Sequence, residues 1–381
     1  MYGLELAGEE DAFAAFEARS VAAGVELIAP GLATAGSVSG RVRDLAYTRS
    51  AIELLGRADA DVAGARALLR AAPIDRRGSV AVRARNVRGT ADVSTRAAER
   101  ELGSVLVDRG FEVDLEEPDH VLRVLFSSGT VEAGSVAVGP VPDTTGETVD
   151  VCLVGWLAAE SARDFGRRKP TDRPFFQPGS MAPVDARAYA NVAGAGPGRL
   201  VVDPMCGTGG LLIEAGLVGS RVLGVDAQTK MVRGCRENLR AFLDDGFEVA
   251  RGDATHLPLR EATRGNGAGS DDGTLHERTV DAVVFDAPYG RQSKIARHEL
   301  AALVEGALGE ARRVTRPDGR TVLIADRSYR EAARDAGWRV DRIFRRRVHR
   351  SLDRYVHVLV GADEGAEAVT KADSDGGVSQ A

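Results

Sequence analysis

A glycine-rich turn constrains the fold of this chain more than any other segment. Residues 203–210, with the sequence DPMCGTGG, follow a short apolar run at 200–202 and precede a second apolar run at 211–217. Glycine permits backbone conformations that other residues avoid, so the turn can bring backbone amides close to a ligand at the start of a helix. Taken alone, the turn suits a dinucleotide, a flavin or no ligand at all, so the segments around it decide its meaning.

Strand-like and helix-like segments alternate from Arg199 onward. The expected strands are residues 200–202, 222–225, 247–250, 280–285 and 321–325, the expected helices are residues 211–217, 231–243 and 300–314, and residues 338–348 and 355–360 form an expected closing hairpin. Such alternation is typical of a parallel sheet covered by helices on both faces. The sequence therefore predicts an α/β domain with a Rossmann-like sheet.

The first half of the chain follows a different pattern. Residues 80–85 alternate between apolar and polar side chains, as a half-buried strand does, and residues 121–126 and 151–156 resume strand character. Between the first two segments, apolar residues recur at the spacing of one helix face, namely Ala98, Leu102, Val105 and Leu106. This half is expected to be an α+β module distinct from the sheet domain.

The length of 381 residues also favours two domains, each with its own core. A glycine- and aspartate-rich stretch at 264–274 offers little to bury and is expected to be a surface insertion. The expected domains are an N-terminal module at 1–160, an arginine- and proline-rich linker at 161–178, the sheet domain at 179–361 and a disordered acidic tail at 362–381.

The composition favours a cytoplasmic protein without a metal ion. No apolar run approaches the ~18 to 20 residues of a membrane-spanning helix, and no signal peptide is recognisable. Cys152, Cys206 and Cys235 lack the spacing of a metal site. The net charge of -6 would count against a nucleic-acid partner, but arginines concentrate at 163–173 and 342–354 while the tail is acidic. The charge distribution therefore permits such a partner.

Two acidic residues follow the next strands at the same expected edge of the sheet. Asp226 ends the second strand about twenty residues after the turn, where a carboxylate can accept hydrogen bonds from a ribose diol. Asp253 follows the third strand, where a carboxylate can meet the amino group of an adenine. Because Thr255 follows it, Asp253 also suits a solvated turn or a helix cap.

The tetrapeptide DAPY at residues 286–289 follows the apolar strand at 280–285. An ordinary turn around a proline is the alternative interpretation. Together with the glycine-rich turn, Asp226 and Asp253, however, the tetrapeptide resembles the motifs of class I S-adenosylmethionine-dependent methyltransferases. Within that family it is similar to the motif of the branch that methylates amino groups.

The resemblance implies a role for each residue of the tetrapeptide. An amino group on a base ring is a poor nucleophile because its lone pair is delocalised into the ring. Asp286 and the Ala287 carbonyl would accept hydrogen bonds from this amine and direct its lone pair toward the methyl sulfonium. Pro288 would stiffen the loop, and Tyr289 would stack on an extruded base.

Two longer segments narrow the resemblance. Residues 203–215 (DPMCGTGGLLIEA) and 173–187 (RPFFQPGSMAPVDAR) look like the archaeal tRNA (guanine-10-N2)-methyltransferases, which carry an N-terminal THUMP domain. Residues 83–124 are similar to that domain through looser motifs, so the N-terminal module is expected to combine a ferredoxin-like part with a THUMP RNA-binding part. The resemblance covers about residues 45–360 and departs from the family pattern at the glycine-rich insertion and at Met205-Cys206.

The resemblance also implies a cofactor, S-adenosyl-L-methionine, and the residues around it. The expected cofactor residues are Gln177, Pro178, Gly179, Ser180, Met181, Asp203, Met205, Cys206, Gly207, Thr208, Gly209, Asp226, Ala227, Asp253 and Ala254. The expected RNA-binding residues are Arg83, Arg85, Arg88, Arg167, Arg168 and Lys169. Phe175 and Phe176 are expected in the core rather than on a base, and Glu214 is expected to face outward near a helix N-terminus.

The activity implied by the resemblance is methyl transfer to the N2 amine of a tRNA guanine, at position 10, once or twice, by a monomer. One alternative is an amino-methyltransferase that acts on another RNA, or on DNA at adenine N6 or cytosine N4. A non-catalytic RNA-binding protein that keeps the methyltransferase fold is an alternative of another class, and a donor-binding assay separates it. The sequence leaves open whether a small activating partner protein is required, as for some related tRNA methyltransferases.

Overall fold

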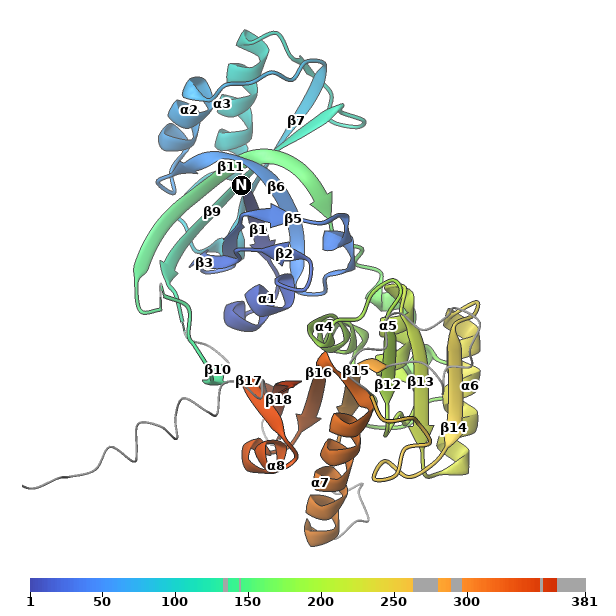
Figure 1. The fold of residues 1–381 in the computed structure, drawn as a ribbon. Coiled ribbons are helices and arrows are strands. Elements are labelled where there is room, and N and C mark those ends of the chain that lie inside the picture. The colour runs from blue at the N-terminus through green and yellow to red at the C-terminus, as the bar shows by residue number, and fades with distance from the viewer. Residues whose placement is uncertain (133–135, 144, 263–279, 289–296, 350–351, 362–381) are drawn as a thin grey trace, which may run out of the picture. The chain divides into compact units, whose positions relative to one another are not determined.

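The chain folds into two compact units. In the computed structural model the described residues are 1–132, 136–143, 145–262, 280–288, 297–349 and 352–361. The first unit comprises Met1–Val136 and Pro140–Arg168, and the second comprises Ala137–Gly139 and the chain from Lys169 (Figure 1). The expected insertion at 264–274 and the expected tail at 362–381 lie outside the described residues.

A curved sheet is the scaffold of the first unit. Its strands are β1 (Tyr2–Leu6), β3 (Glu26–Ala29), β4 (Leu32–Ala35), β6 (Thr48–Ala58), β7 (Ser79–Asn86), β8 (Glu112–Val113), β9 (His120–Thr130) and β11 (Thr148–Glu160), in the spatial order β3-β4-β1-β6-β11-β9-β7-β8. Strands β2 (Ala22–Ala23) and β5 (Ser37–Val38) form a separate short ladder. Strand β7 runs parallel to β8 and β9. Figure 1 shows the long strands β9 and β11 bending along their length.

Three helices accompany this sheet: α1 (Asp11–Ala18), α2 (Val62–Ala71) and α3 (Thr95–Asp108). Helix α3 packs on α2 and β7. Its predicted apolar face is confirmed, because Ala98, Leu102, Val105 and Leu106 are all buried. Short 3-10 helices follow at Gly40–Asp44, Val87–Gly89 and Phe165–Arg168, and a further one, Pro170–Asp172, lies in the second unit.

The second unit contains a mixed sheet. Its strands are β10 (Val136–Val138), β12 (Leu200–Asp203), β13 (Arg221–Asp226), β14 (Phe247–Arg251), β15 (Val280–Asp286), β16 (Thr315–Ala325), β17 (Trp338–His349) and β18 (Leu352–Gly361), in the order β10-β17-β18-β16-β15-β12-β13-β14. Strands β12 to β16 run parallel, whereas β18 is antiparallel to β16 and β17. The predicted Rossmann-like sheet and its closing hairpin are therefore confirmed.

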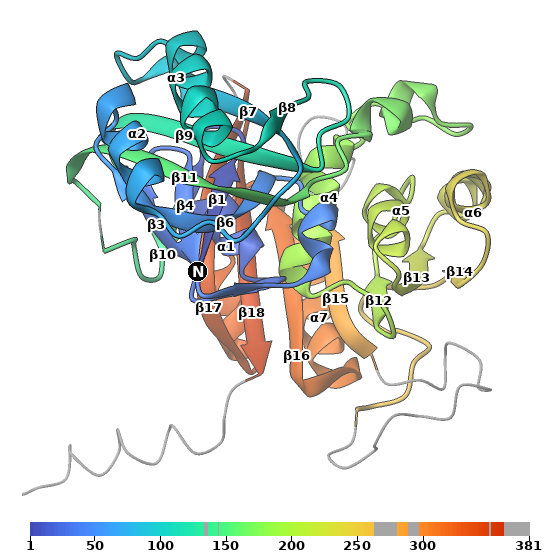
Figure 2. The same ribbon diagram turned by 90° about the horizontal axis from the view of Figure 1, so that it is seen from above.

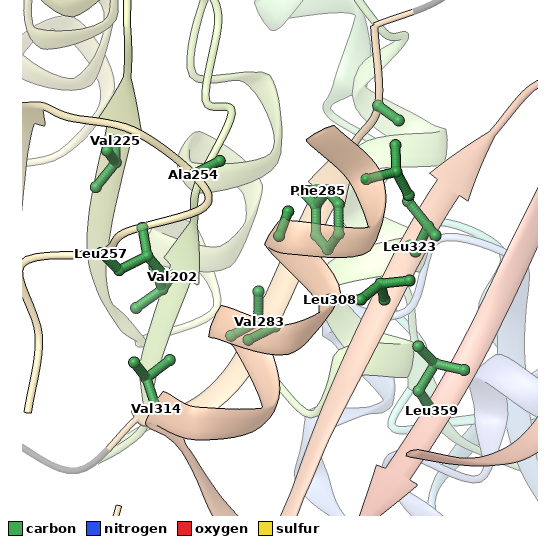
Figure 3. Close-up of a cluster of buried hydrophobic side chains, with 14 of the residues drawn as sticks. Val202, Val225, Ala254, Leu257, Val283, Phe285, Leu308, Val314, Leu323 and Leu359 are labelled. Atoms are coloured by element: carbon green, nitrogen blue, oxygen red, sulfur yellow. The ribbon is translucent and has the colours of Figure 1, made fainter. Parts of the chain in front are cut away.

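Helices cover both faces of this sheet, as predicted. They are α4 (Pro183–Ala193), α5 (Gly210–Leu217), α6 (Thr229–Phe242), α7 (Arg297–Val314) and α8 (Arg330–Asp335). Leu308 of α7 shares an apolar core with Leu223 and Phe285 of the strands. Figure 3 labels Leu308 and Phe285 within this core. Gly224 is the residue of β13 that follows Leu223, and a Cβ added to it would lie 2.7 Å from Leu212 of α5. Successive residues of a strand point to opposite faces of the sheet. Helix α5 therefore covers the face opposite α7.

Helices α4 and α6 also pack against strands of this sheet. Helix α4 packs on β15 and β16, and α6 packs on β13 and β14 (Figure 2). Strand β16 begins at Thr315, six residues before the expected start at residue 321. Strand β10 and helices α4 and α8 of this unit were not predicted. None of the described helices has the length and the apolar character needed to cross a membrane.

Candidate active site

The order of the parallel strands fixes where a ligand can bind. Strand β12 lies between β13, which follows it in the chain, and β15, which comes later. A crevice opens at such a switch point, at the carboxyl ends of the strands. Asp203 ends β12 and Asp286 ends β15, so both carboxylates lie at this crevice.

A cavity of about 200 Å³ occupies this place. Its lining residues are Gln177, Pro178, Gly179, Ser180, Met181, Asp203, Met205, Cys206, Gly207, Thr208, Gly210, Leu211, Met231 and Asp286. Three segments far apart in the sequence thus meet around one space: the loop before α4, the glycine-rich turn and the end of β15. Among these residues, Gly210, Leu211 and Met231 were not predicted as site residues.

Hydrogen bonds hold the glycine-rich turn against the neighbouring strand β13. The Cys206 N–H donates to the Val225 carbonyl at 2.9 Å, and the Gly207 N–H donates to Asp226 Oδ2 at 3.0 Å. Asp226 Oδ1 accepts from the Gln228 N–H at 2.8 Å. Gly209 has a φ of +79°, and a Cβ there would lie 2.8 Å from the sulfur of Cys235, so glycine is required at this position.

The carboxylates at the crevice repel one another. Burial raises the pKa of Asp203 well above its usual value, and the charges of Asp226 and Asp286 raise it further, although a hydrogen bond from the Met205 N–H opposes the shift. Burial also raises the pKa of Asp226. An opposite charge nearby would favour the ionised carboxylates. The cavity therefore suits a cationic ligand such as a sulfonium.

The loop before α4 is tied to the glycine-rich turn. The Ser180 N–H and hydroxyl both donate to the Gln177 carbonyl, at 3.2 and 2.7 Å, which closes a tight turn. The Ser180 hydroxyl also lies 3.2 Å from the Thr208 hydroxyl of the glycine-rich turn. Two of the predicted cofactor segments thus contact each other directly.

Helices α4 and α5, which follow these two segments, are joined by a buried ion pair. Arg187 Nη2 of α4 lies 2.8 Å from Glu214 Oε2 of α5, and the two side chains are 6% and 0% exposed. The expectation that Glu214 faces outward is therefore wrong. A solvent-facing glutamate at this helix position can interact favourably with the helix dipole, but here Glu214 pairs with Arg187 of the preceding helix α4 and is buried.

The adjacent phenylalanines differ from each other. Phe175 packs on Gly234 of α6, where a Cβ would lie 2.0 Å from its ring. Its backbone N–H donates to Asn238 Oδ1, and Asn238 Nδ2 donates to the carbonyls of Phe175 and Thr208, each at 2.8 Å. Phe176 is exposed, so the expectation that it lies in the core is wrong. Asn238 supports the turn from within α6, and no motif in the sequence identified it.

The tetrapeptide places its first residue in the cavity. Asp286 lines the cavity, and the Ala287 N–H donates to the Ile324 carbonyl of β16 at 2.9 Å, which anchors the loop to the sheet. Pro288 is partly buried. Tyr289 lies outside the described residues, so its predicted stacking role stays a prediction.

The predicted cofactor residues that do not line the cavity are Gly209, Asp226, Ala227, Asp253 and Ala254. Asp253 is exposed and accepts from the Thr255 N–H and hydroxyl at 2.9 and 2.8 Å, which lowers its pKa. This is the turn arrangement that the sequence allowed as an alternative. Ala254 is buried in the core, and Ala227 accepts a hydrogen bond from Arg251. Their predicted contacts with the cofactor stay predictions.

The predicted RNA-binding arginines of the first unit all have protein partners. Arg83 donates to the Leu115 carbonyl at 2.7 Å, and Arg85 pairs with a buried glutamate of β1. Arg88 pairs with Asp11 through both terminal nitrogens, one of them at 3.0 Å. The side chains of Arg85 and Arg88 are 42% and 26% exposed, so both keep some exposed surface.

Arg167, Arg168 and Lys169 lie at the boundary of the two units. Arg167 and Lys169 are exposed. Arg168 is buried and binds both oxygens of Asp164, at 2.7 and 2.9 Å. Its guanidinium therefore stabilises a local turn, which argues against the prediction that it contacts RNA.

Comparison with known proteins identifies the family of this chain. A model of the RMKL-like methyltransferase domain family UPF0020 matches residues 170–356. The tRNA (guanine(10)-N2)-dimethyltransferase of Methanothermobacter thermautotrophicus is 35% identical over 287 residues, which are 74% of this chain and 73% of the relative. This chain belongs to the tRNA (guanine(10)-N2)-dimethyltransferase family. It is an enzyme, and its methyl donor is S-adenosyl-L-methionine.

Two further proteins are similar to this chain at lower identity. The U6 snRNA (guanine-N(2))-methyltransferase THUMPD2 of Mus musculus is 28% identical over 168 residues, which are 43% of this chain and 28% of that protein. The crystal structure of TrmN from Thermus thermophilus is 22% identical and has a TM-score of 0.45, with 95% of this chain and 100% of that chain covered.

Proposed function

We propose that this enzyme methylates the N2 amine of guanine 10 in tRNA, adding one or two methyl groups. The observation that carries the proposal is the position of Asp286. It lines the same cavity as the glycine-rich turn, next to a loop that a backbone hydrogen bond fixes to β16. The names of the family members supply the substrate and the position within it.

The residues of the cavity fit the donor. Asp226 holds the glycine-rich turn against β13, and glycines 207 and 209 leave room for a ligand close to the backbone. Asp203, Asp226 and Asp286 give the cavity the negative potential that a sulfonium needs. S-adenosyl-L-methionine bound there supplies an electrophilic methyl group. We propose that residues 177–181, Asp203, residues 205–209 and Asp226 hold it.

Asp286 and the Ala287 carbonyl hold the guanine amine in this proposal. Each accepts one hydrogen bond from the amine, which turns the nitrogen lone pair away from the base ring. When the nitrogen gains the methyl group, it becomes positively charged, and the nearby carboxylate stabilises that charge. The departing proton can pass to Asp286. Most of the remaining rate enhancement would come from alignment of the two reactants.

The partner that the proposal requires is tRNA, bound in part by the first unit, which we propose contains a THUMP domain. The enzyme would act as a monomer in the cytoplasm. Some related tRNA methyltransferases use a small activating protein. If this enzyme needs one, the purified chain would be inactive and a cell extract would restore its activity.

The proposal predicts the chemical identity of the product. The purified chain is incubated with labelled donor and, in parallel, with unmodified tRNA, single-stranded DNA and no substrate, and the nucleosides are separated. Label in N2-methylguanosine supports the proposal. Label in N6-methyladenine or N4-methylcytosine from DNA would favour the alternative amino-methyltransferase. Donor binding without transfer to either nucleic acid would favour the RNA-binding alternative.

A further inference from the structure

A buried carboxylate in the first unit gathers several arginines. Glu5 of β1 is 1% exposed. Its Oε1 lies 2.9 Å from Arg85 Nε and 3.8 Å from Arg49 Nε, and its Oε2 lies 2.9 Å from Arg123 Nη2. The Ser50 hydroxyl donates to the same oxygen at 3.2 Å. Strands β1, β6, β7 and β9 each contribute to this cluster, so the sheet brings together residues far apart in the sequence.

The positive charges of this cluster exceed the negative ones. Arg163, just beyond the end of β11, adds a further guanidinium, and Glu160 adds one carboxylate at 3.9 Å from Arg123. Burial lowers the pKa of Arg49, and the charges of Arg85 and Arg163 lower it further, each with a larger effect than the opposing attraction of Glu5. With Arg49, Arg85, Arg123 and Arg163 against Glu5 and Glu160, the arginines outnumber the carboxylates.

The outer ends of two arginines are available to a ligand. Arg49 and Arg85 contact Glu5 through Nε, and their side chains are 36% and 42% exposed. Within the described part of the chain, their terminal Nη groups have no hydrogen bond to protein. Arg163 uses Nη1 to donate to the Ala46 carbonyl at 3.2 Å, which holds its side chain in the first unit.

Such a surface fits the phosphates of an RNA backbone. A guanidinium is planar and offers paired donors to phosphate oxygens, and its charge persists at any physiological pH. The chain has a net charge of -6, so an acidic ligand needs a local excess of positive charge, which this arginine cluster provides. A ligand that presents several phosphates in a row matches several guanidinium groups in one place.

We propose that Arg49 and Arg85, positioned by the buried Glu5, form with Arg163 a phosphate-binding site for the RNA backbone. The proposal rests on the proposed function, because it assumes that RNA is the substrate. It adds Arg49, which the sequence did not single out, and Arg163, which the sequence placed only in an arginine-rich stretch. Arg123, which is mostly buried, acts with Glu5 as a support and not as a ligand-binding group.

The salt dependence of RNA binding tests this site. Affinity for an unmodified tRNA transcript is measured by filter binding across salt concentrations for the wild type, for Arg49→Gln with Arg85→Gln, and for Arg66→Gln as control. Arg66 is similarly exposed on the same unit and pairs with Glu101. Each lost phosphate contact should reduce the slope of log K against log salt by roughly 0.7 to 0.9. The control should keep the wild-type slope.

Further variants separate the possible results. Lysine at positions 49 and 85 keeps the charge and should restore most of the slope. A Gln double variant with the wild-type slope and affinity would overturn the site. An equal reduction of the slope in the Arg66→Gln control would also overturn the site, because the loss of any exposed arginine would then have the same effect. A wild type that binds no tRNA would instead contradict the proposed function. Another result is that inorganic phosphate competes with tRNA at millimolar concentration while the slope of log K against log salt stays the same in the Gln double variant. That result would indicate a small-anion site and overturn the RNA assignment.

Discussion

Asp286 is the residue on which the proposed chemistry depends. Asp286→Asn keeps the size of the side chain and removes the charge that would stabilise the methylated nitrogen. We expect kcat to fall by about 10² to 10³, as when a preorganised electrostatic group is removed from other active sites. The dissociation constant for S-adenosylhomocysteine, measured by calorimetry, should change little.

The matched control for this variant is Asp318→Asn. Asp318 is an exposed carboxylate near the start of β16, at the opposite end of the sheet from Asp286. Its replacement should leave kcat unchanged. Full turnover by the Asp286→Asn enzyme would contradict the proposed role of this residue.

His357 makes the second unit sensitive to acid. This residue of β18 is fully buried, its Nε2 accepts from the Tyr329 N–H at 2.8 Å, and its Nδ1 lies 3.2 Å from the Leu323 carbonyl. Burial lowers its pKa to about 4 from 6.5. The unfolded chain therefore binds the proton first, and folding stability falls as pH decreases from about 6.5 toward 4. The loss should approach 3 kcal/mol, at about 1.4 kcal/mol per pKa unit.

The measurement compares His357→Gln with the histidine enzyme. Both carry Trp156→Phe, so that the fluorescence of Trp338 in β17 reports the second unit alone. Urea unfolding is followed at pH 7 and at pH 4.5. Glutamine can still accept the Tyr329 hydrogen bond, and its free energy of unfolding should depend less on pH. Equal pH dependence of the two proteins would show that His357 is not the group responsible.

Residues with a local function were predictable, and those with distant partners were not. The glycine-rich turn, Asp226 and Asp286 follow strands at positions where only a few residue types work, so their places in the sequence identified them. Glu214 and Asn238 depend on Arg187 and Phe175, which lie elsewhere in the chain. One sequence does not reveal which partner a buried polar side chain will meet.

At the scale of elements, the ion pair between α4 and α5 sets the spacing of two cofactor loops. Glu214→Gln leaves the Arg187 guanidinium buried without its counter-charge. Breaking a buried pair in this way costs about 3 to 5 kcal/mol. The free energy of unfolding from urea titration should fall by this amount, and the affinity for S-adenosylhomocysteine should fall with it because the loops lose their common support.

An apolar double variant distinguishes stability from loop positioning. Arg187→Met with Glu214→Leu replaces both charges by side chains of similar size, which often restores stability. We expect a free energy of unfolding near that of the wild type, together with weaker binding of S-adenosylhomocysteine. Wild-type affinity in this stable variant would mean that the ion pair has no part in positioning the loops.

The strands and helices from β12 onward were largely predictable from periodicity, whereas no element before residue 79 was predicted. The strand β15 and the helix α7 begin and end within a few residues of the expected positions, because long apolar patterns define both. Strand β10 was missed because it has only three residues and owes its place to pairing with a strand about two hundred residues away. Helix α8 is short and carries mostly charged residues, so it leaves no clear pattern.

At the scale of the whole molecule, the distribution of charge matters more than its sum. The chain has a net charge of -6, yet three arginines converge around Glu5 in the first unit, and the charge of Arg163 adds to theirs. The second unit presents carboxylates to a cationic donor instead. Each unit thus carries the electrostatic potential that suits its own proposed ligand, and a single value of net charge conceals this difference.

The most direct test of the account is methyl transfer from labelled S-adenosyl-L-methionine to an unmodified tRNA transcript, compared with the same transcript in which guanine 10 is replaced by adenine. We predict labelled N2-methylguanosine from the first transcript and none from the second. Equal labelling of both transcripts would contradict the proposed position, and the absence of label from the first, with and without cell extract, would contradict the proposed function itself.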